Sequence, residues 1–191
     1  IIPGGIRVTA LPGFREGWFY VQDPSTLTAV QLLDPQPGEA ILDTCAAPGG
    51  KTFAIAEKMN GQGTLVALDP YPDRIKQLQE NAKRLRYTFV RIRQLAIDRL
   101  NPDEQAQLMA ESGGLGFDRI LVDVPCTNTG VLRRRPEARW HFSEPYLARA
   151  IEQQVAILNV AIHYLKPGGL LVYSTCSLEP EEGKGLMRRW L

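Results

Sequence analysis

The chain has 191 residues, 44% of them hydrophobic and 23% charged, with a formal net charge of +1. This length and composition fit one domain with a sizeable core, and the near-zero charge means that any polyanion must be bound by a local cluster. The sequence has no apolar run near the roughly 20 residues that cross a bilayer, and its three cysteines lack the Cys-x-x-Cys spacing of a zinc site.

We therefore expect no membrane contact, no bound metal and a reducing, cytoplasmic setting. Ile1 stands where a gene product would begin with methionine, so we expect the chain to be part of a longer protein. Residues 1–16 are rich in glycine and proline and are predicted to form an opening segment or linker. The folded core is predicted to occupy residues 17–191.

Apolar runs and helical periodicity alternate along this core. The polar stretch 101–112 has a helical composition and is predicted to be a surface excursion. Strands are predicted at 40–43, 64–69, 88–95, 117–123 and 170–174, and helices at 27–33, 51–59, 72–85, 143–164 and 179–191. Such alternation specifies an α/β fold with a doubly wound, mainly parallel sheet, whose ligands lie at the carboxyl ends of the strands.

The turn after the first predicted strand is a candidate ligand-binding site. The run 48–52, Pro-Gly-Gly-Lys-Thr, looks like the end of a P-loop, but Cys45 stands where that motif needs its first glycine. The Gly-x-Gly-x-x-Gly of a dinucleotide site is absent as well. Asp69, which ends the second strand, is placed either to accept hydrogen bonds from both hydroxyls of a ribose or to cap the next helix. The first alternative favours S-adenosylmethionine, an adenosyl ligand with a cationic tail that carries a carboxylate.

Two cysteines follow the carboxyl ends of the fourth and fifth strands. Adjacent strands lie about 4.8 Å apart, so Cys126 and Cys176 are expected to face the same crevice, although buried cysteine is also common as a small hydrophobe. Methylation at carbon-5 of a pyrimidine needs a thiolate that first adds to carbon-6. A carboxyl group such as Asp123 would stabilise the protonated ring, and the target base must be unstacked into the site.

A basic cluster follows Cys126 on the next loop. Local clusters of this kind grip phosphates and stack bases even when the net charge is near zero, although a solvated loop would have a similar composition. His141 is predicted to be structural or to face RNA rather than to act as a base. The cluster consists of Arg133, Arg134, Arg135 and Arg139, together with Trp140 and His141.

Three segments in this order, 43–52, 123–130 and 173–177, resemble the Nop/Sun (Fmu-like) family of RNA cytosine-5 methyltransferases, and the resemblance runs from residue 17 onward. The run 131–136 with Trp140 is similar to the branch that methylates 16S ribosomal RNA. The resemblance implies a Rossmann-like, class I fold that uses S-adenosylmethionine, with residues 17–191 as the methyltransferase catalytic core. It also implies an RNA partner, and we expect a monomer.

The resemblance also implies roles for single residues. Cys176 corresponds to the nucleophile, Cys126 to the cysteine that helps to release the product, and Asp123 to the acid beside them. Cys45 is expected to pack or to contact the cofactor through its backbone, without chemistry of its own. The implied cofactor-binding residues are Cys45, Ala46, Ala47, Pro48, Gly49, Gly50, Lys51, Asp69, Asp98 and Asp123, and the expected substrate-binding residues are Lys51, Pro125, Arg133, Arg134, Arg135 and Arg139.

The chain departs from the family pattern at several points. Thr127-Asn128 replaces a Ser-Gly or Ser-Ala pair, and the run 181–184 keeps only the first part of a Glu-Glu-Asn-x-Glu tail. The family's N-terminal RNA-binding region and its last, antiparallel strands are missing, so we expect a truncated sheet. A tRNA or DNA cytosine-5 methyltransferase and a non-catalytic remnant that binds cofactor or RNA are the alternatives to a ribosomal RNA enzyme.

Overall fold

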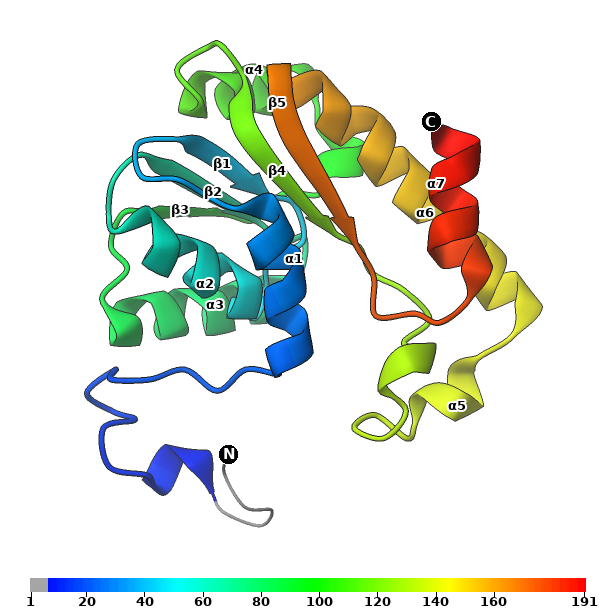
Figure 1. Cartoon of the computed structure of the whole chain (residues 1–191), viewed down its shortest axis with the longest axis horizontal. Coiled ribbons are helices and arrows are strands. Elements are labelled where there is room, and N and C mark those ends of the chain that lie inside the picture. The colour runs from blue at the N-terminus through cyan, green and yellow to red at the C-terminus, as the bar shows by residue number, and fades with distance from the viewer. Residues whose placement is uncertain (1–6) are drawn as a thin grey trace.

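The fold is a single five-stranded sheet between two layers of helices (Figure 1). A computed structural model describes residues 7–191, so part of the predicted opening segment lies outside the described residues. Every pairing between the strands is parallel, and their order is β3-β2-β1-β4-β5. The strands are β1 (Ala40–Asp43), β2 (Thr64–Leu68), β3 (Val90–Arg93), β4 (Phe117–Asp123) and β5 (Leu165–Ser174). The predicted α/β class and parallel sheet are confirmed.

The helices divide between the two faces of the sheet (Figure 1). The first three pack on one face, and α4, α6 and α7 pack on the other. None of the helices in the described part of the chain is long and apolar enough to cross a membrane. The helices are α1 (Leu27–Leu33), α2 (Gly50–Met59), α3 (Pro72–Leu85), α4 (Pro102–Glu111), α5 (Ala138–His141), α6 (Glu144–Ala161) and α7 (Lys184–Trp190).

Side chains of the central strands alternate between the two layers, as the two-residue period of a strand requires. In β1, Ile41 packs with α1 and α2, whereas Leu42 faces the layer of α6. In β4, Ile120 and Val122 face α6, and Leu121 faces α1. Because both faces are covered, these strands read as continuous apolar runs.

Several elements differ from the sequence-based prediction. The last helix begins at Lys184 rather than at residue 179, β3 is shorter than the predicted 88–95, and α5 was not predicted. The stretch 101–112 contains α4, and its Leu108 is 2% exposed in the core, so this helix is more than a surface excursion. The fifth strand begins at Leu165, before the Pro-Gly-Gly run, because Leu165 pairs with Phe117 and a register shift absorbs the extra residues. A proline is tolerated there because β5 is an edge strand of the described sheet.

The strand order creates a crevice at one edge of the sheet. The chain leaves β1 towards β2 on one side, and β4 leads to β5 on the other, so the connections diverge between the adjacent strands β1 and β4. Such a switch point is where open α/β sheets bind ligands. All the acids and cysteines singled out above end or follow strands at this edge, and Asp98 follows β3 in a short helical turn.

Candidate active site

A cleft of about 830 Å³ opens at the switch point. Most of the predicted site residues line it, which brings together segments that are far apart in the chain. Three predicted residues do not: Gly49, Arg133 and Arg139. The lining includes Cys45, Ala46, Ala47, Pro48, Gly50, Lys51, Asp69, Asp98, Asp123, Pro125, Cys126, Arg134, Arg135 and Cys176.

Gly49 shapes the turn from behind the lining. Its φ is 113°, which favours glycine, and a Cβ atom there would lie 2.2 Å from the ring of Phe53. Its N–H donates to the carbonyl of Ala46 at 2.8 Å, and the N–H of Ala46 donates to the carbonyl of Leu68 at 2.8 Å. The guanidinium of Arg74 donates to the carbonyl of Ala47. The turn is therefore fixed to β2 and α3 before any ligand binds.

Two buried acids end β1 and follow β2. Asp43 accepts a hydrogen bond from the Thr52 hydroxyl at 2.7 Å, and burial raises the pKa of Asp43 to about 7. Asp69 Oδ1 accepts from the N–H of Tyr71 at 3.1 Å, while its Oδ2 lies 3.3 Å from Arg74. Asp69 thus supports the start of α3 with one oxygen and keeps the other without a hydrogen bond.

Four buried polar atoms along the cleft make no hydrogen bond. Two of them, Asp23 Oδ2 and Asp69 Oδ2, lie in ion pairs with arginines, and the other two are Gln22 Nε2 and Asp43 Oδ1. Buried polar groups are normally paired, so such atoms point to an absent partner. S-adenosylmethionine carries an amino group and two ribose hydroxyls, which can donate hydrogen bonds to the carboxylates of Asp43 and Asp69. It also carries a carboxylate, which can accept a hydrogen bond from the amide of Gln22. The residues present therefore fit this cofactor. Gln22 was not predicted, because nothing in its own stretch of sequence marks it as a ligand.

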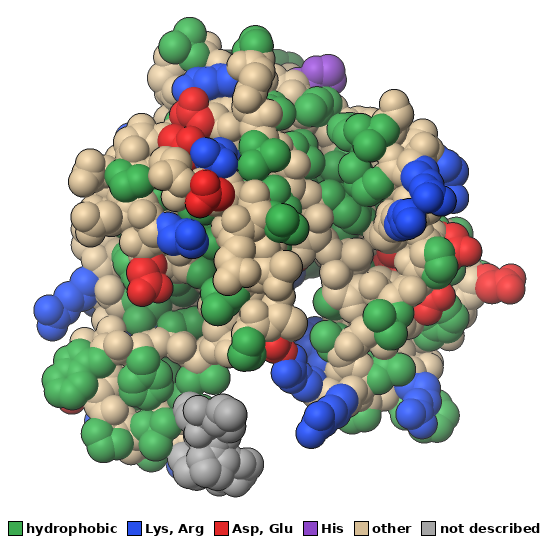
Figure 2. Space-filling view, viewed as in Figure 1, with side chains coloured by type: hydrophobic (Ala, Val, Ile, Leu, Met, Phe, Trp, Pro, Cys, Tyr) green, Lys and Arg blue, Asp and Glu red, His purple; other side chains and the backbone are tan. Residues whose placement is uncertain are grey.

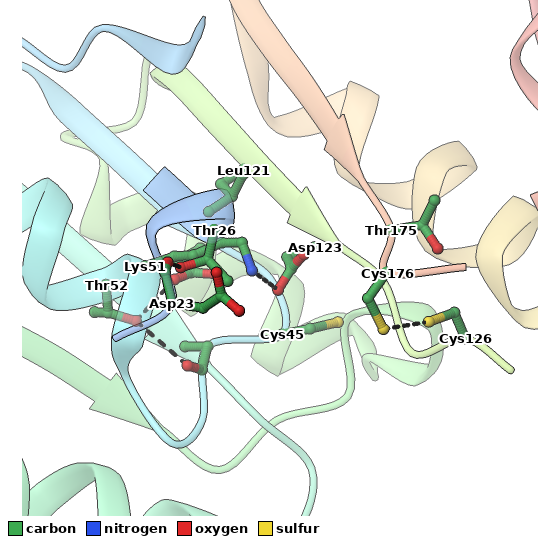
Figure 3. Close-up of polar contacts among 12 residues, drawn as sticks. Asp23, Thr26, Cys45, Lys51, Thr52, Leu121, Asp123, Cys126, Thr175 and Cys176 are labelled. Carbon is green, nitrogen blue, oxygen red and sulfur yellow. Dashed lines mark hydrogen bonds and ion pairs between the residues drawn. The ribbon is translucent and has the colours of Figure 1, made fainter. Parts of the chain in front are cut away.

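An ion pair crosses the middle of the cleft (Figure 3). Lys51 Nζ lies 2.7 Å from Asp123 Oδ2, with the two side chains 16% and 27% exposed. Lys51 comes from the first turn of α2, and Asp123 ends β4, so each is held by an ordered element. The pair places a donor and an acceptor side by side in a partly desolvated site, where both act more strongly than in water.

The two strand-end cysteines meet (Figure 3). Cys126 Sγ lies 2.9 Å from Cys176 Sγ; the first side chain is buried and the second is exposed. A hydrogen bond from the Cys176 thiol lowers the pKa of Cys126 to about 6, against the opposing effect of burial, and donors at Thr175 and the Asn128 backbone add to the lowering. The same contact raises the pKa of Cys176. The pair therefore favours a state with one thiolate, on Cys126.

Hydrogen bonds join the two loops that carry these cysteines. The N–H of Gly130 donates to the carbonyl of Cys176 at 3.0 Å, and the N–H of Leu178 donates to the Thr129 hydroxyl at 2.9 Å. The hydroxyls of Thr127 and Ser177 lie 3.1 Å apart. The predicted adjacency of the fourth and fifth strands is confirmed, and these bonds extend it past the strand ends.

Cys45 and Asp98 both line the cleft. Burial raises the pKa of Cys45 to about 12, so its sulfur stays a thiol, in agreement with the expectation that it carries no chemistry. The Asp98 side chain is largely buried and lies 3.6 Å from Arg99. Its place in the cleft agrees with the cofactor role implied by the resemblance, and that role stays a prediction.

The arginine cluster borders the cleft around α5, where Figure 2 shows basic side chains beside a hollow. Arg134 forms an ion pair with Asp23 from the segment before α1, so the two rims of the cleft are joined. Arg133, Arg139 and Trp140 are exposed, and Trp140 retains 82% of its surface. Within residues 7–191, no group of three or more His, Cys, Asp or Glu side chains is close enough to hold a metal ion.

Comparison with known proteins identifies the family. The family model described as 16S rRNA methyltransferase RsmB/F matches residues 30–191. The chain belongs to this family. Members of the RsmB/F family depend on S-adenosylmethionine, which agrees with the unpaired atoms of the cleft.

Two curated relatives illustrate the match. The probable ribosomal RNA small subunit methyltransferase B of Synechocystis is 39% identical over 197 residues, and the alignment covers 100% of this chain and 42% of that protein. The ribosomal RNA small subunit methyltransferase B of Vibrio cholerae is 42% identical over 184 residues, with 96% and 40% covered. The chain therefore spans about two fifths of the length of these relatives.

Solved structures show the same fold. The crystal structure of NSun6 from Pyrococcus horikoshii with SFG, an analogue of S-adenosylmethionine, superposes with a TM-score of 0.83 at 33% identity. The match covers 96% of this chain and 44% of the NSun6 chain. A methyltransferase homologue from the same organism gives a TM-score of 0.78 at 33% identity and covers 97% of this chain and 55% of that one. The fold is thus that of the class I methyltransferases.

Proposed function

We propose that the protein methylates carbon-5 of a cytosine in RNA, and that this RNA is small-subunit ribosomal RNA. The observation that carries the proposal is the pair of thiols 2.9 Å apart beside the Lys51–Asp123 ion pair, in a cleft that fits the cofactor. The names of the curated relatives support ribosomal RNA as the substrate. The thiol pair favours carbon-5 as the methylated position. Methylation of that carbon needs a thiol that first adds to carbon-6, whereas methylation of the exocyclic or ring nitrogens needs no thiol.

Cys176 is the proposed nucleophile. Its side chain is exposed at the cleft, so a flipped-out cytosine can reach its sulfur and its proton can leave to water. The sulfur adds to carbon-6, and the electron pair of the ring double bond moves towards carbon-5. The bound cofactor supplies the electrophilic methyl group that carbon-5 accepts.

Asp123 and Lys51 are placed to handle the charge of the ring. Addition at carbon-6 is easier when the ring is protonated or hydrogen-bonded at its Watson–Crick edge. Asp123 offers a carboxyl oxygen at the end of β4, and the Lys51 ammonium 2.7 Å away keeps that carboxyl oriented. Lys51 and Asp123 lie on the side of Cys176 that faces the turn with Thr52 (Figure 3), so in this proposal the base lies between them and the sulfur.

Cys126 is the proposed release group. The donors around it favour its thiolate, which can accept the carbon-5 proton as the bond between Cys176 and carbon-6 breaks. One observation favours the reverse assignment, in which Cys126 attacks: its pKa is the lower of the two. The 6% exposure of Cys126 argues against it, because the attacking sulfur must reach a base in the cleft.

The methylated product tests the proposal. The protein is incubated with S-adenosylmethionine that carries a labelled methyl group and with an unmodified transcript of small-subunit ribosomal RNA. We expect mass spectrometry of the digested nucleosides to find the label in 5-methylcytidine, and none with Cys176→Ala. Label in any other nucleoside would contradict the proposal. Calorimetric binding of the cofactor without transfer to any RNA would favour a non-catalytic remnant.

A further inference from the structure

Glu182 is a buried acid that the proposed chemistry does not use. Its side chain is 0% exposed, and among the described residues no ion pair includes it. A buried carboxylate without a cation is costly unless hydrogen bonds satisfy it. Here the donors are the N–H of Thr127 at 3.0 Å, the Thr127 hydroxyl, and Gln154 Nε2 at 2.8 Å.

These donors belong to the loop that carries Cys126. Glu182 holds the residue after Cys126 through the backbone and side chain of Thr127. Gln154 holds the residue before it, because its Nε2 also donates to the carbonyl of Pro125 at 3.0 Å. Both flanks of Cys126 are thus bound to one buried network, which takes Gln154 from α6 and Glu182 from the turn before α7.

Tyr173 fixes the acid in turn. Its hydroxyl donates to the carbonyl of Glu182 at 2.7 Å, and Gln154 Oε1 lies 3.2 Å from the same hydroxyl. Tyr173 belongs to β5, only a few residues before Cys176. The network therefore joins the loop that carries Cys126 to the strand that precedes Cys176.

We propose that Glu182 is a positioning residue for Cys126: its carboxylate holds the loop Pro125–Thr127 so that the Cys126 sulfur lies against Cys176. This inference rests on the proposed function. Cys176 lies in the loop after β5, and its sulfur is hydrogen-bonded to Cys126 and Asn128 rather than to Glu182. Loss of the clamp is therefore expected to impair product release more than attack.

The test uses Glu182→Gln, which keeps the shape of the side chain but replaces one acceptor oxygen by an NH2 group. That group is a donor and cannot accept the hydrogen bonds of Thr127 and Gln154. Small misplacements of reacting groups cost up to about 100-fold in rate. We expect turnover on the unmodified transcript to fall about 10-fold to 100-fold. Single-turnover formation of the covalent RNA adduct should stay within about 3-fold of wild type, so the adduct accumulates on a denaturing gel.

Three further variants complete the design. Glu181→Gln changes the exposed neighbouring acid and should leave turnover unchanged, while Cys126→Ala marks full accumulation of adduct. If Glu182→Gln does not fold, Gln154→Met removes both donated bonds at similar volume and should give the same accumulation. The inference would be overturned if adduct formation and turnover fell by the same factor, or if neither Glu182→Gln nor Gln154→Met accumulated adduct. No adduct with Cys126→Ala would instead count against the proposed function.

Discussion

Cys126 and Cys176 have the same side chain but different surroundings. Three kinds of donor converge on Cys126, namely the Cys176 thiol, the Thr175 hydroxyl and backbone N–H groups, whereas the sulfur of Cys176 lies 3.2 Å from an acceptor oxygen of Asn128. A thiolate is stabilised by donors and destabilised by neighbouring negative charge. The surroundings therefore assign a proton acceptor to one position and a protonated, accessible sulfur to the other.

A pH titration tests this assignment. The pKa of Cys126 is lowered from 9.0 to about 6, so its contribution to stability is present above pH 9 and is lost as the pH falls through about 6. We expect one step of thiolate absorbance in the ultraviolet near pH 6 in the wild type. Cys126→Ala should remove the step, and Cys176→Ala should move it upward because the largest cause of the shift is gone. A step unchanged in Cys176→Ala would contradict the assignment.

We propose that Asp69 binds the ribose of the cofactor. Hydrogen bonds to charged groups contribute about 1.5 to 3 kcal/mol, so Asp69→Asn should weaken binding of S-adenosylmethionine about 10-fold to 100-fold by calorimetry. Asp73→Asn changes an exposed acid in the first turn of α3 and serves as the matched control. Equal affinities for the two variants would mean that Asp69 supports the start of α3 and does not hold the cofactor.

At the scale of elements, the turn between β1 and α2 depends on one glycine. Alanine at Gly49 would be strained by the positive φ and would overlap the ring of Phe53, whereas Gly61 has a φ of 72° and nothing within 4 Å of a new Cβ atom. Backbone strain costs about 1 to 3 kcal/mol, and overpacking adds about 1 to 3 kcal/mol. In denaturant unfolding, Gly49→Ala should therefore lose more stability than Gly61→Ala. Equal losses would show that the overlap is relieved.

The sequence allowed prediction of the elements that local patterns determine. The apolar runs of β1, β2 and β4 and the helical periodicity of α3 and α6 are all local, and the strand-end positions of Cys126 and Cys176 followed from them. The role of α4 was harder to predict, because a single leucine in a polar helix reaches the core. Its burial depends on tertiary packing, which local periodicity does not report.

Parts of the site could not be predicted, because they depend on contacts between distant segments. The pairing of Asp23 with Arg134 and the unpaired amide of Gln22 arise where the segment before α1 crosses the cleft. Glu182 was visible as part of a motif, but its contact with Thr127 depends on how the segment after β5 folds back. Each is set by the assembled fold.

For the whole molecule, we propose that the arginine cluster beside the cleft provides the surface for RNA. In our account Arg133 and Arg135 bind phosphates, and each contact with single-stranded nucleic acid contributes about 0.7 to the salt dependence of log K. We expect Arg133→Gln with Arg135→Gln to weaken RNA binding at low salt and to reduce the slope of log K against log salt. Lys76→Gln, an exposed basic residue of α3, is the control. An unchanged slope would remove these arginines from the interface.

In the proposed reaction, Cys176 attacks the base and Cys126 releases the product. A denaturing gel of protein incubated with S-adenosylmethionine and the unmodified small-subunit ribosomal RNA transcript distinguishes these two roles. We expect that Cys126→Ala accumulates a covalent RNA–protein adduct and that Cys176→Ala forms none. An adduct that persists in Cys176→Ala and disappears in Cys126→Ala would contradict it.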